Sequence, residues 1–254
     1  MRAIQDPSLP HLVWLHPAMT EPPRPPSLTD LPFFRGADAA ALERLSAAAR
    51  WRTVEPGQVV VDEDEPSTDI FFVATGAVRV QLRAASGREV LLNEFGAGEF
   101  FGELSAIDGA PRAANVSAIA RSRLCIIPAQ AFLDFVFTTP TACHALLRTL
   151  AAKLRLQTER TLEREALPVR LRLFSELLRL SRPRAGAPTE RVVSPPPPHH
   201  ELAARIGARR EVVSRELSDM TREGWLARDR RAIRILRVME MQALVAAELR
   251  APAA

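Results

Sequence analysis

The chain contains few cysteines, almost no lysine and no long apolar run. Its two cysteines among 254 residues, Cys125 and Cys143, lie in apolar contexts without the spacing of metal ligands. Iron–sulfur ligation needs more sulfur, so buried free thiols are expected. No apolar run approaches the ~20 residues that span a bilayer, and residues 11–16 form too short a core for an export signal. The sequence therefore predicts a cytoplasmic protein with no membrane partner.

The scarcity of lysine leaves arginine to carry the positive charge, and that charge is unevenly distributed. Lys153 is the one lysine in the chain. Residues 1–167 contain 17 basic and 20 acidic side chains, a net charge of −3, whereas residues 168–254 contain 17 basic and 10 acidic ones, a net charge of +7. A basic C-terminal third behind a mildly acidic body indicates a polyanion-binding domain joined to a domain with another task.

Turn residues divide the N-terminal half of the chain. Residues 1–27 hold seven prolines and no apolar periodicity, which predicts a flexible arm. A short helical region follows, with Thr29 or Asp30 as a cap and an alanine-rich helix over residues 39–49. Residues 51–128 then read as short strands separated by glycine turns, the rhythm of an antiparallel barrel or jelly roll. The expected fold class is therefore α+β.

Individual strands and turns can be placed within that region. Residues 59–61 form a buried strand, and residues 71–73 form another. Apolar and polar side chains alternate over residues 78–83, which predicts a half-buried strand. A hairpin turn is expected at residues 86–89, and a further turn at Gly96 and Gly98.

The region after the strands reads as helices interrupted by prolines. Residues 132–166 are helical with a break near residues 139–140, and Pro168 ends the long helix. Steps of four and three on this helix predict the seam of a paired helix, formed by Leu147, Ala151, Leu154, Thr158 and Thr161. Residues 169–180 form an amphipathic helix, and the proline-rich residues 181–198 are expected to form a loop.

The segment most informative about function places one carboxylate and one guanidinium among small residues. Residues 100–105 read FFGELS and residues 111–115 read PRAAN. Backbone N–H groups of a short turn approach a phosphate only where side chains are small, and a buried arginine such as Arg112 neutralises its charge with paired hydrogen bonds. Glu103 is left to accept a hydrogen bond from a ribose hydroxyl. The segment therefore suits a sugar cyclised to a phosphate.

These residues resemble the phosphate-binding cassette of cyclic-nucleotide-binding domains, which reads F-G-E-L-(A/S)…P-R-(S/A)-A. The order of the turns before it also matches the β-roll of those domains. One departure is the acidic turn at residues 63–65, where the family often has a glycine. The residues that the resemblance assigns to the ligand are Gly102, Glu103, Leu104, Ser105, Arg112 and Ala113.

The long helix adds two further candidate ligand residues. In bacterial members of the resembled family the helix after the β-roll is the dimer interface and touches the base, and Gln157 and Thr158 fall at the positions of the base-contacting hydroxyl pair. Gln157 departs from that pattern, so the identity of the preferred base is left open. A solvated or cross-dimer hydrogen bond is the alternative role for both residues. Ala113 offers no hydroxyl to the exocyclic amine of guanine, which favours cAMP over cGMP as the effector, with cGMP the alternative.

Residues 200–217 have the spacing of a helix–turn–helix. Apolar residues line one face of residues 202–206, Gly207 permits the tight turn, and Val213 and Leu217 anchor the second helix. Arginine on such a helix can reach O6 and N7 of guanine, glutamate can accept from N4 of cytosine, and neighbouring arginines hold phosphates. Residues 228–235 read as a basic β-hairpin wing.

The second helix resembles the recognition helix of the CRP/FNR family of bacterial transcription regulators. Glu211 and Arg215 match the base-reading pair of that family, Arg210 matches the arginine of its CRP-like branch, and Ser214 is more typical of its FNR-like branch. The resemblance covers residues 28–240. The residues expected at DNA are Arg205, Arg209, Arg210, Glu211, Ser214, Arg215, Arg230 and Arg231.

The predicted architecture has five parts. They are the arm at 1–27, the cyclic-nucleotide-binding-like β-roll at 28–136, the dimerisation helix at 137–167, the winged helix–turn–helix at 168–240 and a C-terminal helix or tail at 241–254. The resemblance implies a homodimer without catalytic activity that reads an inverted repeat in double-stranded DNA, is gated by a cyclic nucleotide, and has RNA polymerase as a further partner. No obligatory cofactor is expected.

Three other interpretations remain. A regulator of the same family could respond to another signal or to none, with Arg112 and Glu103 in a structural role. A cupin-type metalloenzyme would need clustered histidine and carboxylate ligands, whereas all five histidines lie outside the expected strands, and His199 and His200 fit a loop or helix start. A haem-linked gas sensor could use an axial ligand from a terminus or helix, although no residue argues for it.

Overall fold

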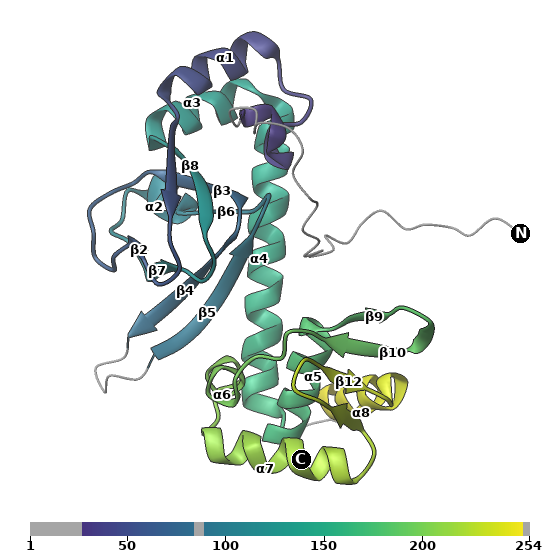
Figure 1. Ribbon diagram of the computed structural model, residues 1–254. Coiled ribbons are helices and arrows are strands. Elements are labelled where there is room, and N and C mark those ends of the chain that lie inside the picture. Colours follow the sequence, from purple (N-terminus) through teal and green to yellow (C-terminus); the bar gives the residue numbers. More distant parts are fainter. Residues whose placement is uncertain (1–26, 84–88, 251–254) are drawn as a thin grey trace, which may run out of the picture. The chain divides into compact units, whose positions relative to one another are not determined.

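The computed structural model describes residues 27–83 and 89–250 (Figure 1). Its contacts divide the chain into two compact units, Met1–Arg79 with Glu94–Cys143, and Val80–Asn93 with His144–Ala254. The predicted arm, apart from its last residue, and most of the predicted hairpin turn at 86–89 lie outside the described residues. No helix within the described ranges is long and apolar enough to cross a membrane.

Two four-stranded sheets form the β-roll and confirm the predicted α+β class. Their strand orders are β1-β8-β3-β6 and β2-β7-β4-β5. The strands are β1 Arg50–Val54, β2 Val59–Val61, β3 Ile70–Thr75, β4 Ala77–Arg83, β5 Glu89–Gly96, β6 Phe100–Phe101, β7 Asn115–Ala118 and β8 Ser122–Ile127.

The apolar run at the start of β3 is buried because both faces of this central strand are covered. In β3 the residues from Ile70 to Val73 are all buried, and Phe72 lies opposite Cys125 of β8 in the antiparallel register. The predicted half-buried strand over residues 78–83 is confirmed as β4, in which Arg79, Val80, Gln81 and Leu82 are all half-buried. Arg79 donates to Glu94 at 2.6 Å, which holds this polar side chain against the sheet rather than in solvent.

Short helices cover one end of the first unit. They are the 3-10 turns η1 Leu28–Asp30 and η2 Pro32–Phe34, and the α-helices α1 Ala39–Ala48, α2 Glu103–Asp108 and α3 Ala129–Thr138. The predicted cap is corrected, because Ser27 caps η1 and Asp30 lies within it. Asp38 caps α1 by accepting from the N–H of Ala41 at 3.0 Å. The predicted helix at 39–49 is confirmed to within one residue.

Aromatic side chains join these helices to the sheet. The ring of Phe34 in η2 lies 4.8 Å from that of Phe72 in β3 and 5.5 Å from that of Phe135 in α3. Each buried phenylalanine removes a large apolar surface from water and adds edge-to-face or tilted ring contacts. The N-terminal turns are thus part of the β-roll core.

The long helix α4 Pro140–Ala166 follows a break at Thr139, as predicted. All five predicted seam positions on it are exposed in the single chain, and Leu147 and Leu154 are 59% and 69% exposed. Pro168 then caps α5, whose bounds Val169–Leu180 coincide with the predicted amphipathic helix.

The C-terminal unit contains a winged helix–turn–helix. Its remaining elements are β9 Arg182–Arg184, β10 Ala187–Val193, α6 His199–Ile206, α7 Arg210–Arg222, β11 Leu226–Arg228, β12 Ile233–Ile235 and α8 Val238–Arg250. The loop predicted for residues 181–198 is wrong, because β9 and β10 extend the wing into a sheet of order β11-β12-β10-β9. Pro183 lies on the edge strand and Pro188 within a register shift, positions where the missing N–H is tolerated.

One apolar core holds that unit together. Leu173 and Leu177 of α5, Leu217 of α7 and Ile235 of β12 are each fully buried in it. Periodic apolar residues from the helices and the wing thus meet in a single cluster, which fixes the orientation of α7 against the hairpin.

Candidate functional site

The predicted cassette forms a turn around a buried arginine. Gly102 adopts φ of +86° where β6 gives way to α2, and no side chain caps that helix start. Arg112 is only 4% exposed. Its Nη1 donates to the carbonyl of Gly102 at 3.2 Å, and its Nη2 donates to the carbonyl of Asp69 at 2.7 Å and to the hydroxyl of Ser67 at 3.0 Å. Two segments, residues 67–69 and the turn at Gly102, therefore converge on one guanidinium.

The free-energy cost of burying the charge of Arg112 is only partly offset by the carboxylates around it. Burial lowers the pKa of this guanidinium from its ordinary value, while the nearby carboxylates of Glu65, Asp69 and Glu103 act in the opposite direction. Its Nε is buried without a hydrogen-bond partner among the described residues. A buried donor without an acceptor costs free energy, so this side of the guanidinium suits an added anionic acceptor.

The other cassette residues divide into buried and exposed groups. Glu103 and Ser105 are buried, and the hydroxyl of Ser105 donates to the carbonyl of Pro111 at 3.4 Å. Leu104 and Ala113 are exposed. The buried pair lines the turn, while the exposed pair leaves its outer side open.

The acidic turn at 63–65 is bonded directly to the cassette. The N–H of Asp64 donates to the carbonyl of Arg112 at 3.1 Å, and the N–H of Arg112 donates to the carbonyl of Glu65 at 3.2 Å. Asp64 has φ of +66°, the left-handed conformation that glycine favours and that aspartate tolerates. This turn fixes the backbone from which the Arg112 side chain projects.

The two candidate residues on α4 belong to the other compact unit. Gln157 and Thr158 are both exposed, and the hydroxyl of Thr158 donates to the carbonyl of Leu154 within the helix at 3.0 Å. Their role toward a ligand stays a prediction.

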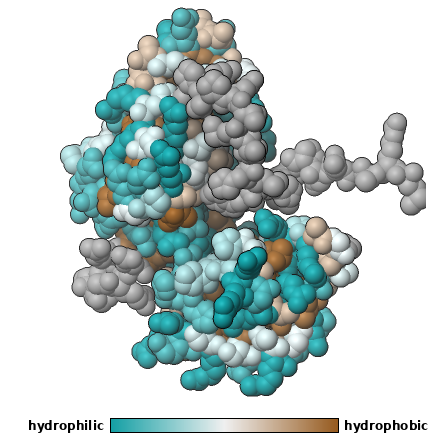
Figure 2. All heavy atoms as spheres, viewed as in Figure 1, coloured by the Kyte–Doolittle hydropathy of each residue, from teal (hydrophilic) through white to brown (hydrophobic). Residues whose placement is uncertain are grey.

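The helix–turn–helix has the predicted geometry. Gly207 ends α6 with φ of +65°, and Leu202, Ile206, Val213 and Leu217 are buried between α6, α7 and the rest of the unit. On the opposite side of α7 and just before it, the exposed residues are Arg209, Arg210, Glu211 and Arg215. In Figure 2 the face around α7, at the bottom of the view, is mostly hydrophilic.

One predicted phosphate contact is corrected. The side chain of Arg205 is 9% exposed and pairs with Glu201 at 2.9 Å and with Glu176 at 3.4 Å. The step of four residues from Glu201 to Arg205 places both on one helix face, and that face packs against α5. Arg205 therefore holds α6 in place and does not lie free on the exposed side of α7.

The wing places its basic residues at the tip of a hairpin. The carboxylate of Asp229 accepts from the N–H groups of Arg231 and Ala232 at 2.7 and 2.8 Å, which closes the turn. Arg230 and Arg231 are exposed at this tip. The local Asx-type bonds explain why the sequence turns here.

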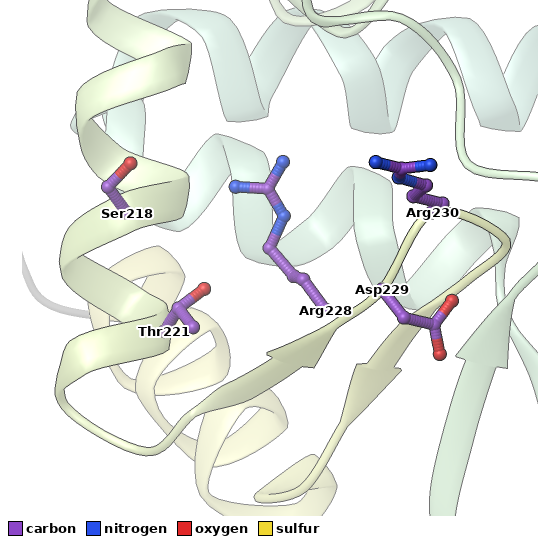
Figure 3. Close-up of a pocket in the computed structure, with 5 residues that line it drawn as sticks. All are labelled: Ser218, Thr221, Arg228, Asp229 and Arg230. Carbon is purple, nitrogen blue, oxygen red and sulfur yellow. The ribbon is translucent and has the colours of Figure 1, made fainter.

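An open groove of about 480 Å³ lies between α7 and the wing. Figure 3 shows Arg228 extending toward the side of α7 that carries Ser218 and Thr221, while Asp229 points away. Arg230 also lines the groove. Two guanidinium groups beside two hydroxyls make a surface suited to an anion such as a nucleic-acid phosphate.

Comparison with known proteins matches both units. A family model of the cyclic nucleotide-binding domain matches residues 51–139, and one of the Crp-like helix-turn-helix domain matches residues 171–244. The cyclic AMP receptor protein of Thermus thermophilus is 31% identical over 196 residues, 76% of this chain and 87% of the relative. The chain belongs to the CRP/FNR family. It is accordingly a DNA-binding transcription regulator of the CRP/FNR type.

Other members of the CRP/FNR family respond to different effectors. The CRP-like cAMP-activated global transcriptional regulator of Mycobacterium tuberculosis is 28% identical over 80% of this chain and 91% of the relative. The solved c-di-GMP responsive global regulator CLP of Xanthomonas campestris is 26% identical, with a TM-score of 0.65 over 79% of this chain and 99% of that chain. The family therefore fixes the DNA-binding role more firmly than the ligand.

Sequence reasoning missed several residues that shape the two sites of this CRP/FNR regulator. Ser67 and Asp69 hold the Arg112 guanidinium, and His199 and Arg228 lie in contact beside α7. The Asp69 contact uses a backbone carbonyl, which leaves no signature in side-chain identity. His199 does begin a helix as predicted. Its place at the start of α6 was the one sign in the sequence that it could lie near the second helix.

The cysteines and metal-type side chains add no further site. Burial raises the pKa of the Cys125 thiol to about 12, so it stays protonated and unreactive, whereas Cys143 is half-buried rather than buried as predicted. Within residues 27–83 and 89–250, no group of three or more histidine, cysteine, aspartate or glutamate side chains could hold a metal ion.

Proposed function

We propose that this regulator is a homodimer gated by a cyclic nucleotide bound at the β-roll cassette, with cAMP favoured over cGMP. The observation that supports it is the buried guanidinium of Arg112, whose Nε has no acceptor among the described residues and which lies beside the buried Glu103. A phosphate supplies the anionic acceptor, and Glu103 accepts from a ribose hydroxyl. Gly102, Leu104, Ser105 and Ala113 complete the proposed cassette.

The choice between purines rests on two residues. Ala113 carries no hydroxyl for the exocyclic amine of guanine, while Gln157 can donate to or accept from either base. The cAMP-activated regulator of Mycobacterium tuberculosis and the cyclic AMP receptor protein of Thermus thermophilus support adenine. We assign Gln157 and Thr158 to base contact because they fall at the positions of the base-contacting hydroxyl pair in the family.

The proposed DNA contacts follow the exposed side of α7 and the wing. Arg210, Glu211, Ser214 and Arg215 read base edges in the major groove, and Arg209, Arg230 and Arg231 hold phosphates. Paired copies place two α7 helices one DNA turn, ~34 Å, apart on an inverted repeat. Ligand shifts the equilibrium toward that spacing only if it binds the DNA-competent state more tightly. RNA polymerase in the cytoplasm is the further partner proposed.

A second candidate function has a specific observation in its favour. The Nη atoms of Arg112 already donate to three protein oxygens, the arrangement of a purely structural arginine. In that case the chain regulates transcription without a cyclic-nucleotide response.

Fluorescence anisotropy separates the two candidates. The full chain is titrated onto labelled inverted-repeat duplexes at fixed salt, alone and with cAMP or cGMP. Tighter binding with one nucleotide supports gating and identifies the effector. Equal, sequence-specific binding in all three conditions supports the second candidate.

Replacement of Arg112 by alanine tests the cassette directly. Because the guanidinium supplies the positive charge at the proposed phosphate, Arg112→Ala is expected to weaken cyclic-nucleotide binding by roughly a hundredfold, about 3 kcal/mol. Isothermal titration calorimetry measures this loss. Arg121→Ala, at an arginine that is 75% exposed in the same unit, is the matched control and should bind as wild type. Unchanged affinity in Arg112→Ala contradicts the assignment.

A further inference from the structure

A hydrogen-bonded chain of three side chains crosses the DNA-facing side of the C-terminal unit. Nδ1 of His199 in α6 lies 2.7 Å from the hydroxyl of Ser214 in α7, and its Nε2 lies 2.8 Å from Nη2 of Arg228 at the end of β11. One imidazole therefore bridges the first helix, the recognition helix and the wing. The sequence placed His199 at a loop or helix start and Arg228 in the basic wing, without a hydrogen-bond partner for either.

The chemistry of Arg228 determines where the imidazole carries its proton. A guanidinium has donors only, so Nε2 of His199 must accept from it. The proton of the neutral ring then lies on Nδ1 and is donated to Ser214. Burial lowers the pKa of His199, and the charges of Arg228 and Arg210 lower it further, in agreement with a neutral ring at neutral pH.

The tautomer of His199 determines whether the hydroxyl of Ser214 donates or accepts a hydrogen bond toward a ligand. A serine hydroxyl can normally donate or accept. Here its oxygen takes the hydrogen bond from His199, and the structure shows no acceptor for its hydrogen among the described residues. The hydroxyl hydrogen is therefore available to a ligand that approaches α7.

We propose that His199 is a specificity-determining positioning residue that fixes Ser214 as a hydrogen-bond donor toward DNA. Serine so fixed favours base edges with an acceptor, namely N7 of a purine, O6 of guanine or O4 of thymine, over the N4 amine of cytosine. His199 itself touches no base; it acts through Ser214 and anchors Arg228 beside the groove. This inference rests on the proposed approach of α7 to the major groove.

The test measures base preference rather than affinity alone. Preferred duplexes are selected with the full chain from a random-sequence library, and each base pair of the half-site is then replaced in turn, with binding measured by anisotropy at neutral pH. Ser214→Ala should identify the base pair that the hydroxyl reads. His199→Phe keeps an aromatic ring at this position but can neither donate to Ser214 nor accept from Arg228. It should reduce preference at that base pair roughly three- to tenfold, the contribution of one hydrogen bond.

Two further variants separate this role from a structural one. His199→Asn keeps an N–H close to the place of Nδ1 and should restore the preference at that base pair. His200→Gln, at the exposed neighbouring histidine, should leave every preference unchanged.

The outcomes are distinct. A loss of preference confined to the Ser214 base pair supports the inference. An unchanged profile in Ser214→Ala or His199→Phe, or a uniform loss of affinity at all base pairs, overturns it. If the wild-type chain selects no preferred duplex, the proposed function itself fails. That failure is seen with the wild-type chain alone, before any histidine variant is measured.

Discussion

At the scale of single residues, Gly102 has little freedom to change. A Cβ atom there would lie 2.8 Å from Nη1 of Arg112 and 2.8 Å from the carbonyl oxygen of Asp69, in addition to the strain of φ at +86°. Gly109, at the other end of α2, has φ of +72° but nothing within 4 Å. The two glycines share a backbone conformation and differ in crowding.

Alanine substitutions separate crowding from strain. Gly109→Ala should lower the free energy of unfolding by about 1 kcal/mol, the cost of a left-handed alanine, whereas Gly102→Ala should lower it by about 3 kcal/mol because Arg112 must also move. Urea unfolding measures both values. Equal losses would show that the close approach of Arg112 to Gly102 adds nothing to the loss in free energy of unfolding.

At the scale of elements, an ionic cluster joins three helices of the C-terminal unit. Glu176 of α5 is 2% exposed and accepts from Arg179 at 2.5 Å and from Arg205 of α6 at 3.4 Å. Arg179 in turn pairs with Glu163 of α4 at 2.8 Å. One buried carboxylate therefore connects the long helix to the first helix of the DNA-binding motif.

Loss of that carboxylate should destabilise the unit strongly. Glu176→Ala leaves two largely buried guanidinium groups with less compensation, and we expect the free energy of unfolding to fall by about 3 kcal/mol. The matched control is Asp219→Ala, which removes the exposed pair with Arg222 and should cost less than about 1 kcal/mol. Chemical denaturation compares the two, and a loss of equal size in both variants would contradict the role of burial.

At the scale of the whole molecule, α4 presents an apolar seam with no cover in the single chain. Leu147 and Leu154 are more than half exposed, and Ala151, Thr158 and Thr161 continue the same face. Apolar residues in heptad steps favour burial against a second copy of the same helix.

Disruption of the seam tests the proposed homodimer. Leu154→Glu should convert the chain to a monomer and weaken binding to an inverted repeat, because two carboxylates would face each other across the seam. Light scattering after size exclusion reports the mass. Ala152→Glu, two positions away at an exposed residue outside the seam, should remain dimeric. A dimeric Leu154→Glu protein would place the interface elsewhere.

The sequence by itself determined the elements whose signals are local. The bounds of α5, the break at Thr139 and the turn at Gly207 follow from periodicity, proline and glycine, which act on the residues beside them. The cassette and the recognition helix could also be predicted from the sequence, because the residues of each lie close together in the chain.

Only the tertiary structure decided the features that depend on distant partners. Strands β9 and β10 form in a proline-rich segment because β12 pairs with β10. Arg205 turns inward because Glu176 lies 29 residues away in the chain yet within reach, and the carbonyl that anchors Arg112 lies 43 residues before it. Such contacts depend on packing and on backbone atoms common to all residues, and a linear pattern carries no record of them.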